Sequence, residues 1–307
     1  MGRKILVNTA SRYVRQSTGG VLSIRRFGGS LADAQGIIEV DKSTFGGCGY
    51  TPEYIATLES GADRCVWLAE EEQRIVGFVS AFATHSLLAS RWEIDELAVR
   101  PEAQGHGLAS ELVRHAVQEG QRHAELSAAR ALVAANNDAS KRVFTRNGFA
   151  VAAEISLLLY RIAGRVPRLP QAALPSARDA HMKDTGSIAG LCGCPVDRVQ
   201  RLVAASSNAY SVVEDGSQVK GYIEMVRVCT LQYRGLWIES LVARSDNYGV
   251  EQALLNAAVE KGKSDPDIDE VGYLVSAREH MLYTASISEG FRDAGQYLTF
   301  VREAGAT

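Results

Sequence analysis

The stretch Val99-Arg100-Pro101-Glu102-Ala103-Gln104-Gly105-His106-Gly107-Leu108-Ala109 lies between a run typical of a strand and a run typical of a helix. Before it, residues 92–98 mostly alternate between polar and apolar, and after it apolar residues recur at helical spacing as far as Val117. A glycine-bearing turn that opens a helix presents free backbone N–H groups and the positive end of the helix dipole. Glycines also let a ligand approach the backbone closely. The stretch therefore predicts a ligand that carries phosphate.

Two common phosphate-binding motifs do not fit this stretch. It has no G-x-x-x-x-G-K-[ST] and lacks the third glycine of G-x-G-x-x-G, which disfavours P-loop nucleotide hydrolases and dinucleotide-binding folds. The looser pattern Q/R-x-x-G-x-G/A does fit, through Gln104, Gly107 and Ala109. On its own, this pattern also occurs at ordinary strand–turn–helix corners, where glycines serve only the geometry of the turn.

Three more segments of the chain occur in the order that is typical of one family. Residues 65–79 predict a strand hairpin, Leu97-Ala98-Val99 predicts the end of a fourth strand, and residues 137–149 open with Asn and close with Gly148-Phe149. Together with the glycine turn, they resemble the GNAT superfamily of N-acetyltransferases over residues 21–162. The resemblance implies an α/β fold (α+β, with a mixed sheet). It also implies that acetyl-CoA is the co-substrate and that its acetyl group passes directly to a primary amine.

The resemblance also implies which residues form the site. The co-substrate is expected to contact Leu97, Ala98, Val99, Gln104, Gly105, His106, Gly107, Leu108, Ala109, Asn137 and Phe144. An amine arrives as a cation, so a carboxylate must remove a proton before the amine attacks. Glu93 is the first candidate for this base, because several members of the family carry a glutamate base four residues before the position of Leu97. Asp95 or Glu96 is the alternative base, and strand alternation places Asp95 on the face of Glu93 and Glu96 on the other face. The alternative is a solvated acidic strand end that only attracts a cationic substrate.

Phe144 departs from the family pattern, because many members carry a tyrosine there that protonates the leaving thiolate. A water, another group such as Tyr160, or an unassisted departure would have to replace it. The absence of the tyrosine leaves open the alternative that the protein is a sensor, which binds acyl-CoA without turnover. A transferase for a longer acyl group is a third hypothesis, and the sequence does not decide the amine acceptor.

The second half of the chain repeats the first. Gly77 and Gly221 are 144 positions apart in matching contexts, and Gly148 and Gly290 are 142 apart. Three prolines within residues 163–177 indicate a linker. We therefore predict two tandem GNAT folds, with the boundaries 1–20 (N-terminal arm), 21–162 (acetyltransferase domain), 163–177 (linker) and 178–307 (degenerate GNAT-like domain).

The repeat predicts that the second half has lost the phosphate site. At a separation of 144, Glu251 takes the place of Gly107 and Tyr248 that of Gln104, while Glu279 replaces Asn137 at 142. A carboxylate aimed at a pyrophosphate would repel it. We expect the second half to serve as a scaffold, a wall of the substrate cleft or a regulatory module. A shifted alignment that hides an intact site is the alternative.

Composition limits the other functions. A length of 307 residues with 46% hydrophobic content predicts two ordinary domains, and a net charge of −3 disfavours a nucleic-acid-binding surface. No run is apolar enough to span a membrane, so we expect a cytoplasmic protein. Five scattered cysteines do not indicate disulfides, and Cys192-Gly193-Cys194 lacks the partners of a zinc site, so no metal is predicted. The expected partner is a small-molecule or peptide amine, with a homodimer left open.

Overall fold

The computed structural model describes residues 13–16, 21–47, 49–58, 61–162, 175–205, 207–231, 233–244 and 248–305. The first half consists of β1 (Tyr13–Gln16), β2 (Val21–Arg26), α1 (Leu31–Phe45), α2 (Pro52–Thr57), β3 (Arg64–Glu71), β4 (Arg74–His85), β5 (Ser90–Val99), η1 (Pro101–Ala103), α3 (Leu108–Gly120), β6 (Ala128–Ala134), α4 (Asp138–Arg146) and β7 (Ala150–Arg161). The second half consists of β8 (Ala177–Asp179), η2 (Met182–Asp184), α5 (Thr185–Cys192), α6 (Val196–Ala205), β9 (Asn208–Asp215), β10 (Gln218–Cys229), β11 (Arg234–Ala243), α7 (Tyr248–Ser264), β12 (Glu270–Ser276), α8 (His280–Ser288) and β13 (Arg292–Glu303). Residues 163–174 of the predicted linker and most of the predicted arm lie outside the described residues, but β1 of the arm pairs with β2.

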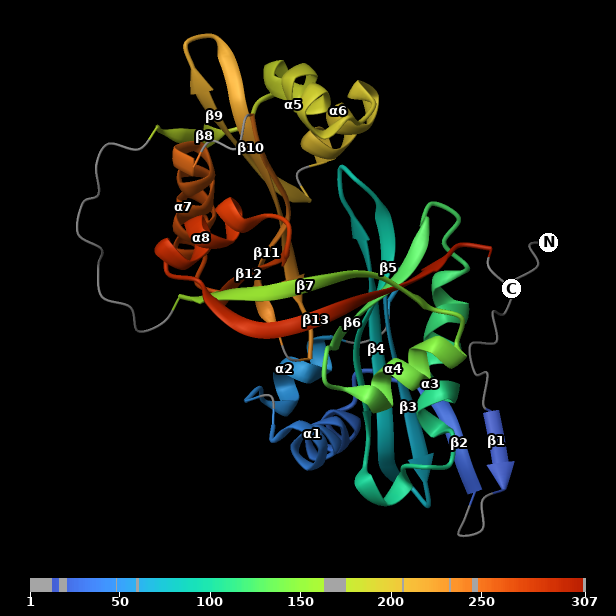
Figure 1. Cartoon of the computed structure of the whole chain (residues 1–307). Helices are drawn as coiled ribbons and strands as arrows, with labels where there is room; N and C mark the ends of the chain where they lie inside the picture. The colour runs from blue at the N-terminus through green and yellow to red at the C-terminus, as the bar shows by residue number, and fades with distance from the viewer. Residues whose placement is uncertain are drawn as a thin grey trace, which may run out of the picture.

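The 13 strands found in these ranges form one mixed sheet in the order β1-β2-β3-β4-β5-β6-β13-β7-β12-β11-β10-β9-β8. Figure 1 shows β7 and β13 crossing the middle of the molecule side by side. The predicted α/β class with a mixed sheet is confirmed. No helix in the described part of the chain is long and apolar enough to cross a bilayer.

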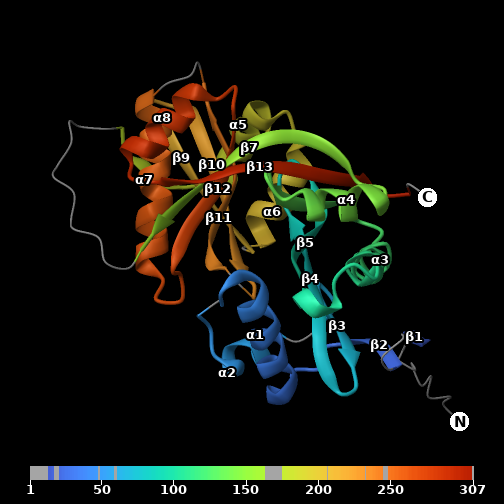
Figure 2. The same cartoon turned by 60° about the horizontal axis from the view of Figure 1, so that its bottom comes forward.

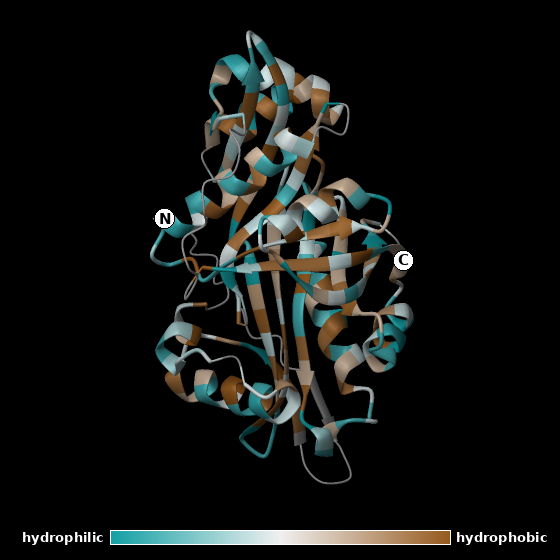
Figure 3. Cartoon of the chain, turned by 60° about the vertical axis from the view of Figure 1, so that its left-hand side comes forward, coloured by the Kyte–Doolittle hydropathy of each residue, from teal (hydrophilic) through white to brown (hydrophobic). Residues whose placement is uncertain are grey.

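Alternating strand residues pack into separate cores on the two faces of the sheet. In the first half, Trp67 and Val79 face the core under α3, whereas Leu68 and Phe78 face the core under α1 and α2. In the second half, α7 and α8 cover one core, and α5 and α6 cover the other. Figure 2 shows the helices on both sides of the strands, and Figure 3 shows hydrophobic residues concentrated along the strands.

The two halves exchange their last strands. β7 follows the helices of the first half but pairs with β12 of the second, while β13, at the end of the chain, pairs with β6 of the first. Phe300 of β13 is accordingly buried in the core of the first half, and Leu158 of β7 in that of the second. The first half therefore closes with only one strand of its own, β7, and the other closing strand is β13.

The sheet ladders reproduce the sequence repeat. β5 and β6 pair in parallel from Arg91/Ala128 to Ile94/Ala131 and then part. β11 and β12 pair from Gly235/Glu270 to Ile238/Tyr273 and then part in the same way. Each half therefore has a V-shaped opening between its two central parallel strands.

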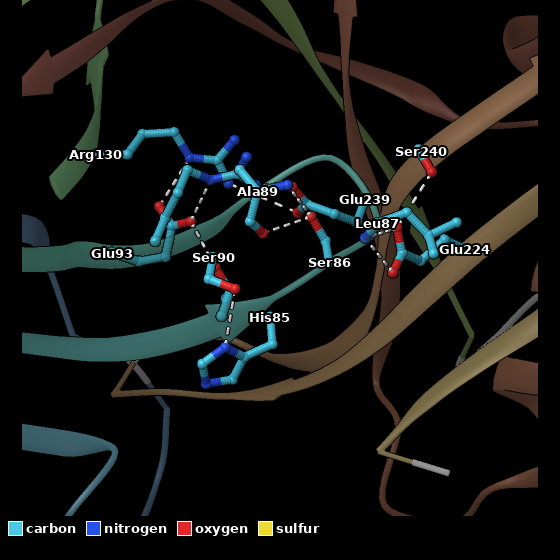
Figure 4. Close-up of polar contacts among 12 residues, drawn as sticks. His85, Ser86, Leu87, Ala89, Ser90, Glu93, Arg130, Glu224, Glu239 and Ser240 are labelled. Carbon is cyan, nitrogen blue, oxygen red and sulfur yellow. Dashed lines mark hydrogen bonds and ion pairs between the residues drawn. The ribbon is translucent and has the colours of Figure 1, made fainter. Parts of the chain in front are cut away.

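A hairpin tip from each half is buried in the other. Leu87, between β4 and β5, lies in the core of the second half, and Leu231, between β10 and β11, lies in the core of the first. Both Glu224 carboxylate oxygens accept the Leu87 N–H at 3.1 Å (Figure 4). Arg198 donates to the Leu87 carbonyl at 2.8 Å. The polar groups of this buried turn are thus satisfied by the opposite half.

We predict that Leu87→Ala lowers the free energy of unfolding by about 2–5 kcal/mol, because it empties a filled site in the core of the other half. The adjacent Leu88 is 57% exposed and provides a matched control on the same turn. Leu88→Ala should change stability by less than about 0.5 kcal/mol. Denaturant unfolding measures both, and equal effects of the two changes would contradict the interlocked arrangement.

Candidate active site

The glycine turn after β5 has the backbone geometry of an anion site. Gly105 and Gly107 both have a φ of 83°, in the left-handed region that favours glycine. A Cβ added at either residue would meet nothing within 4 Å, so the outer side of the turn is open. Gln104 ties the turn to the strand, since its Nε2 donates to the Val99 carbonyl at 2.8 Å.

The first turn of α3 points its N–H groups into this open space. Gly107 is the N-cap residue, and no side chain caps the helix. The first helical bond runs from the Glu111 N–H to the Gly107 carbonyl at 3.2 Å. The N–H groups of Leu108, Ala109 and Ser110 precede that bond, which leaves them for an anion at the positive end of the helix dipole.

Where β5 and β6 part, they enclose a cavity of about 600 Å³, here named the splay cavity. Its walls include Leu97, Asn137 and Phe144, three of the residues predicted to contact the co-substrate. Asn137 caps α4, with its side chain accepting the Ser140 N–H at 3.0 Å. Among the other predicted residues, Ala98, Val99 and Leu108 have side chains in the hydrophobic cores, so only their backbone groups are available to a ligand.

A second cavity of about 310 Å³, here named the central cavity, lies between the two halves. β4, β5 and β6 contribute Phe82, Thr84, Glu93 and Arg130; the second half contributes Val228, Thr230, Tyr233, Trp237, Glu239 and Glu270. The exchanged strands add Leu157 and Leu159 from β7 and Tyr297 from β13. Five residues line both cavities: Ile94, Asp95, Glu96, Leu132 and Tyr297. The two cavities therefore meet at the point where β5 and β6 part.

A β-bulge places Asp95 at this meeting point. Ser80 pairs with Glu96, but Ala81 pairs with Ile94, so Asp95 is the extra residue on β5. The second half has the same bulge at Glu239 of β11. We expected Glu96 to face away from Glu93 and Asp95. That prediction is wrong, since the bulge interrupts the alternation and all three line the central cavity.

Asp95 is a carboxyl suited to exchange a proton near neutral pH. Asp95 lies deep in the molecule, although its side chain is exposed where it borders the two cavities. Its removal from bulk water raises its pKa to about 6, while hydrogen bonds from the Ser80 and Thr230 hydroxyls act in the opposite direction. The Ser80 bond to Oδ2 is 3.0 Å long. A carboxyl with this pKa is ionised at pH 7 and still basic enough to accept a proton.

Glu93 has a different environment. Burial would raise its pKa, but the charges of Arg130 and Arg91, with hydrogen bonds from Arg130 and Thr84, lower it overall. The Arg130 Nε lies 2.8 Å from Oε2 of Glu93 (Figure 4). The Arg91 Nε lies 3.2 Å from Oε1. Both arginines also pair with Glu239 of the second half. Glu93 thus belongs to a buried network of two carboxylates and two guanidiniums.

The second half does not reproduce the glycine turn. Gly77 packs against the Ala98 carbonyl and Leu112, and Gly221 packs against the Val242 carbonyl and Leu254. Leu112 of α3 and Leu254 of α7 therefore occupy equivalent places, which sets the separation of the two helices at 142. The loop before α7 is thus two residues shorter than the loop before α3.

The prediction that Glu251 replaces Gly107 is therefore wrong. Gly249 corresponds to Gly107, Tyr248 to His106, and Glu251 to Ala109. α7 already begins at Tyr248, so Gly249 lies inside the helix, and Glu251 is buried in its first turn. Burial raises the pKa of Tyr273, and the nearby Glu279 and Glu251 carboxylates raise it further. The corresponding place in the second half is thus acidic.

The structure also locates the remaining candidates. Tyr160 lies on β7 in the core of the second half, packed against Phe291, and lines neither cavity. Tyr297 was missed, because the sequence gives no sign that β13 would reach the first half. Among the described residues, no group of three His, Cys, Asp or Glu side chains could hold a metal ion.

Comparison with known proteins agrees with this geometry. Residues 35–149 match the acetyltransferase (GNAT) family model. A GCN5-related N-acetyltransferase from Sphaerobacter thermophilus is 16% identical with a TM-score of 0.60, and the match covers 92% of this chain and 96% of that one. A tandem GNAT protein from the clavulanic acid biosynthesis pathway is 13% identical with a TM-score of 0.57, covering 93% and 99%. A search of curated proteins gives no match. The family model thus matches residues 35–149, and the fold of the whole chain is similar to that of solved GNAT structures, a tandem GNAT protein among them.

We predict that Ala109→Glu, which copies Glu251 of the second half, weakens acetyl-CoA binding at least tenfold. Two like charges about 4 Å apart near a protein surface repel by about 4 kcal/mol, whereas a carboxylate in the first helical turn interacts favourably with the helix dipole of the free protein. Isothermal titration measures the affinity. Gln118→Glu, which adds the same charge to an exposed position near the other end of α3, is the control and should bind normally. Unchanged affinity in Ala109→Glu would show that the pyrophosphate does not lie at this helix.

Proposed function

We propose that the chain transfers the acetyl group of acetyl-CoA to a primary amine at one active site, formed by the first half and completed by the second. The pyrophosphate would lie on the first turn of α3, and the pantetheine arm would follow β5 into the splay cavity. Beyond Ile94, β5 no longer pairs with β6. The backbone groups on this edge of β5 are therefore available to the pantetheine arm. The amine would enter from the central cavity.

The observation that carries this proposal is the position of Asp95. It lies at the junction of the two cavities, and burial raises its pKa to about 6. A thioester that enters from one side and an amine that enters from the other would meet beside its carboxylate. Glu93 lines only the central cavity and is held by two guanidiniums, so we assign the base to Asp95 rather than to Glu93.

The reaction would proceed by direct attack. Asp95 accepts a proton from the ammonium group, and the amine nitrogen then bonds to the thioester carbonyl carbon. A backbone N–H at the parted end of β5, near Leu97, donates to the oxyanion. When the intermediate collapses, the C–S bond breaks, the thiolate takes a proton from a donor, and the extra proton on the nitrogen restores that donor. Asp95 then releases its proton to water. Phe144 has no proton to give, so we assign the donor to Tyr297, the tyrosine that lines both cavities.

We propose that the second half binds no coenzyme. The helix in place of the glycine turn, and the carboxylates of Glu251 and Glu279 beside it, would disfavour a pyrophosphate. Its role would be to supply β13 and the far wall of the central cavity. Titration with acetyl-CoA should accordingly give one binding site per chain.

A first prediction concerns pH. Asp95 must be ionised to act, so kcat/KM should rise with pH, reach half its plateau near pH 6, and rise again only where the amine itself titrates. Asp95→Asn should lower kcat by about 10²–10⁴-fold and abolish the step near pH 6 while leaving acetyl-CoA binding intact. Because the pKa of Glu93 is lowered, a profile that is flat from pH 5 to pH 7 would favour Glu93 instead.

A second prediction concerns the thiolate. Tyr297→Phe removes one hydroxyl and should lower kcat for acetyl-CoA by at least about tenfold. The matched control is Tyr160→Phe, in the core of the second half, which should not lower kcat. Equal kcat values for Tyr297→Phe and the wild type would mean that the thiolate leaves without this donor.

A further inference from the structure

We infer that the acceptor is a primary amine on a compact apolar or aromatic body that carries no carboxylate. This inference rests on the proposed function and concerns the central cavity. With a volume of about 310 Å³, the cavity is at the lower end of the range for small-molecule sites. It therefore suits a body of about one ring rather than a folded protein substrate.

Much of the lining of the central cavity is apolar or aromatic. Leu157 and Leu159 come from β7, and Tyr233 and Trp237 come from the second half. The rings of Tyr233 and Trp237 meet edge to face, with centroids 5.9 Å apart. The hydroxyls of a sugar would find few hydrogen-bond partners along this wall, and burying them unpaired is costly. An apolar body would instead gain from leaving water.

The second half makes room for these aromatic rings with two glycines. Gly235 and Gly272 correspond to Arg91 and Arg130 of the first half in the sheet ladders. A Cβ on Gly235 would collide with the Tyr233 ring, and a Cβ on Gly272 would crowd the Tyr233 hydroxyl and Trp237. The wall is therefore built from backbone positions where only glycine fits.

The charges of the cavity favour a cation and disfavour an anion. Arg130 is the one cationic side chain among the described residues that line it, and it is occupied by Glu93 and Glu239. Glu270 pairs with Arg161 at 2.9 Å. A carboxylate on the acceptor would find no available cation, whereas an ammonium group would find Asp95.

The test is a thiol-release assay with acetyl-CoA and a matched set of amines. 2-Phenylethylamine is the expected substrate, ethylamine lacks its ring, phenylalanine adds a carboxylate, and phenylalaninamide adds a neutral group of similar size. We expect kcat/KM for 2-phenylethylamine to exceed that for ethylamine by at least about 30-fold. This ratio corresponds to the free energy gained when one such ring is buried. Phenylalanine should be poorer than phenylalaninamide by at least about tenfold, which isolates the carboxylate from its bulk.

Trp237 connects the preference to this wall. In Trp237→Ala the ratio of kcat/KM between 2-phenylethylamine and ethylamine should fall at least about fivefold, and Trp237→Phe should retain most of it. Circular dichroism and acetyl-CoA titration confirm that each variant is folded and binds the coenzyme.

The outcomes separate the two proposals. If spermidine, glucosamine or a lysine peptide is acetylated with a higher kcat/KM than 2-phenylethylamine, the inference about the acceptor is wrong and the proposed function stands. If no amine releases CoA although acetyl-CoA binds, the proposed function itself fails and a coenzyme sensor is favoured.

Discussion

The exchange of β7 and β13 is the constraint on which the rest of the structure depends. In the sheet, β13 of the second half lies between β6 and β7 of the first half. Likewise, β7 of the first half lies between β12 and β13 of the second half. Because each exchanged strand buries side chains in the opposite core, neither half can complete its sheet alone. The buried hairpin tips Leu87 and Leu231 add a second reciprocal contact. The two repeats therefore form one cooperative unit, and their relative position is fixed closely enough to build a cavity between them.

This arrangement explains why a half without the glycine turn is retained. The second half supplies Thr230, which donates to Asp95, and the aromatic wall of the central cavity. It also supplies Tyr297, on a strand that is continuous with the sheet of the first half. A single GNAT fold with its own last strand would lack all three. Duplication followed by strand exchange thus provides a central cavity that one repeat could not enclose.

The sequence predicted what depends on neighbouring residues. Gly107 and Asn137 stand at helix starts whose geometry is set within a few positions, and both lie where the pattern indicated. The misplacement of Glu251 has a simple cause, since a loop shortened by two residues leaves no trace in the residues on either side. The choice between Glu93 and Asp95 depended on a bulge and on arginines distant in sequence, and Tyr297 on the strand exchange. These are long-range features, which local spacing cannot reveal.

The pseudo-symmetry brings two equivalent carboxylates, Asp95 and Glu239, to one cavity, and their neighbours decide which of them can act. The first half carries Arg91 and Arg130, which bind both Glu93 and Glu239. A carboxylate held by guanidiniums keeps its charge but loses basicity. The second half has Gly235 and Gly272 at the corresponding positions, so no guanidinium reaches Asp95 from there. Those same glycines admit Tyr233 and Trp237, whose rings line the central cavity together with Asp95. The loss of two arginines from one repeat would thus keep Asp95 basic and also create the aromatic wall of the central cavity.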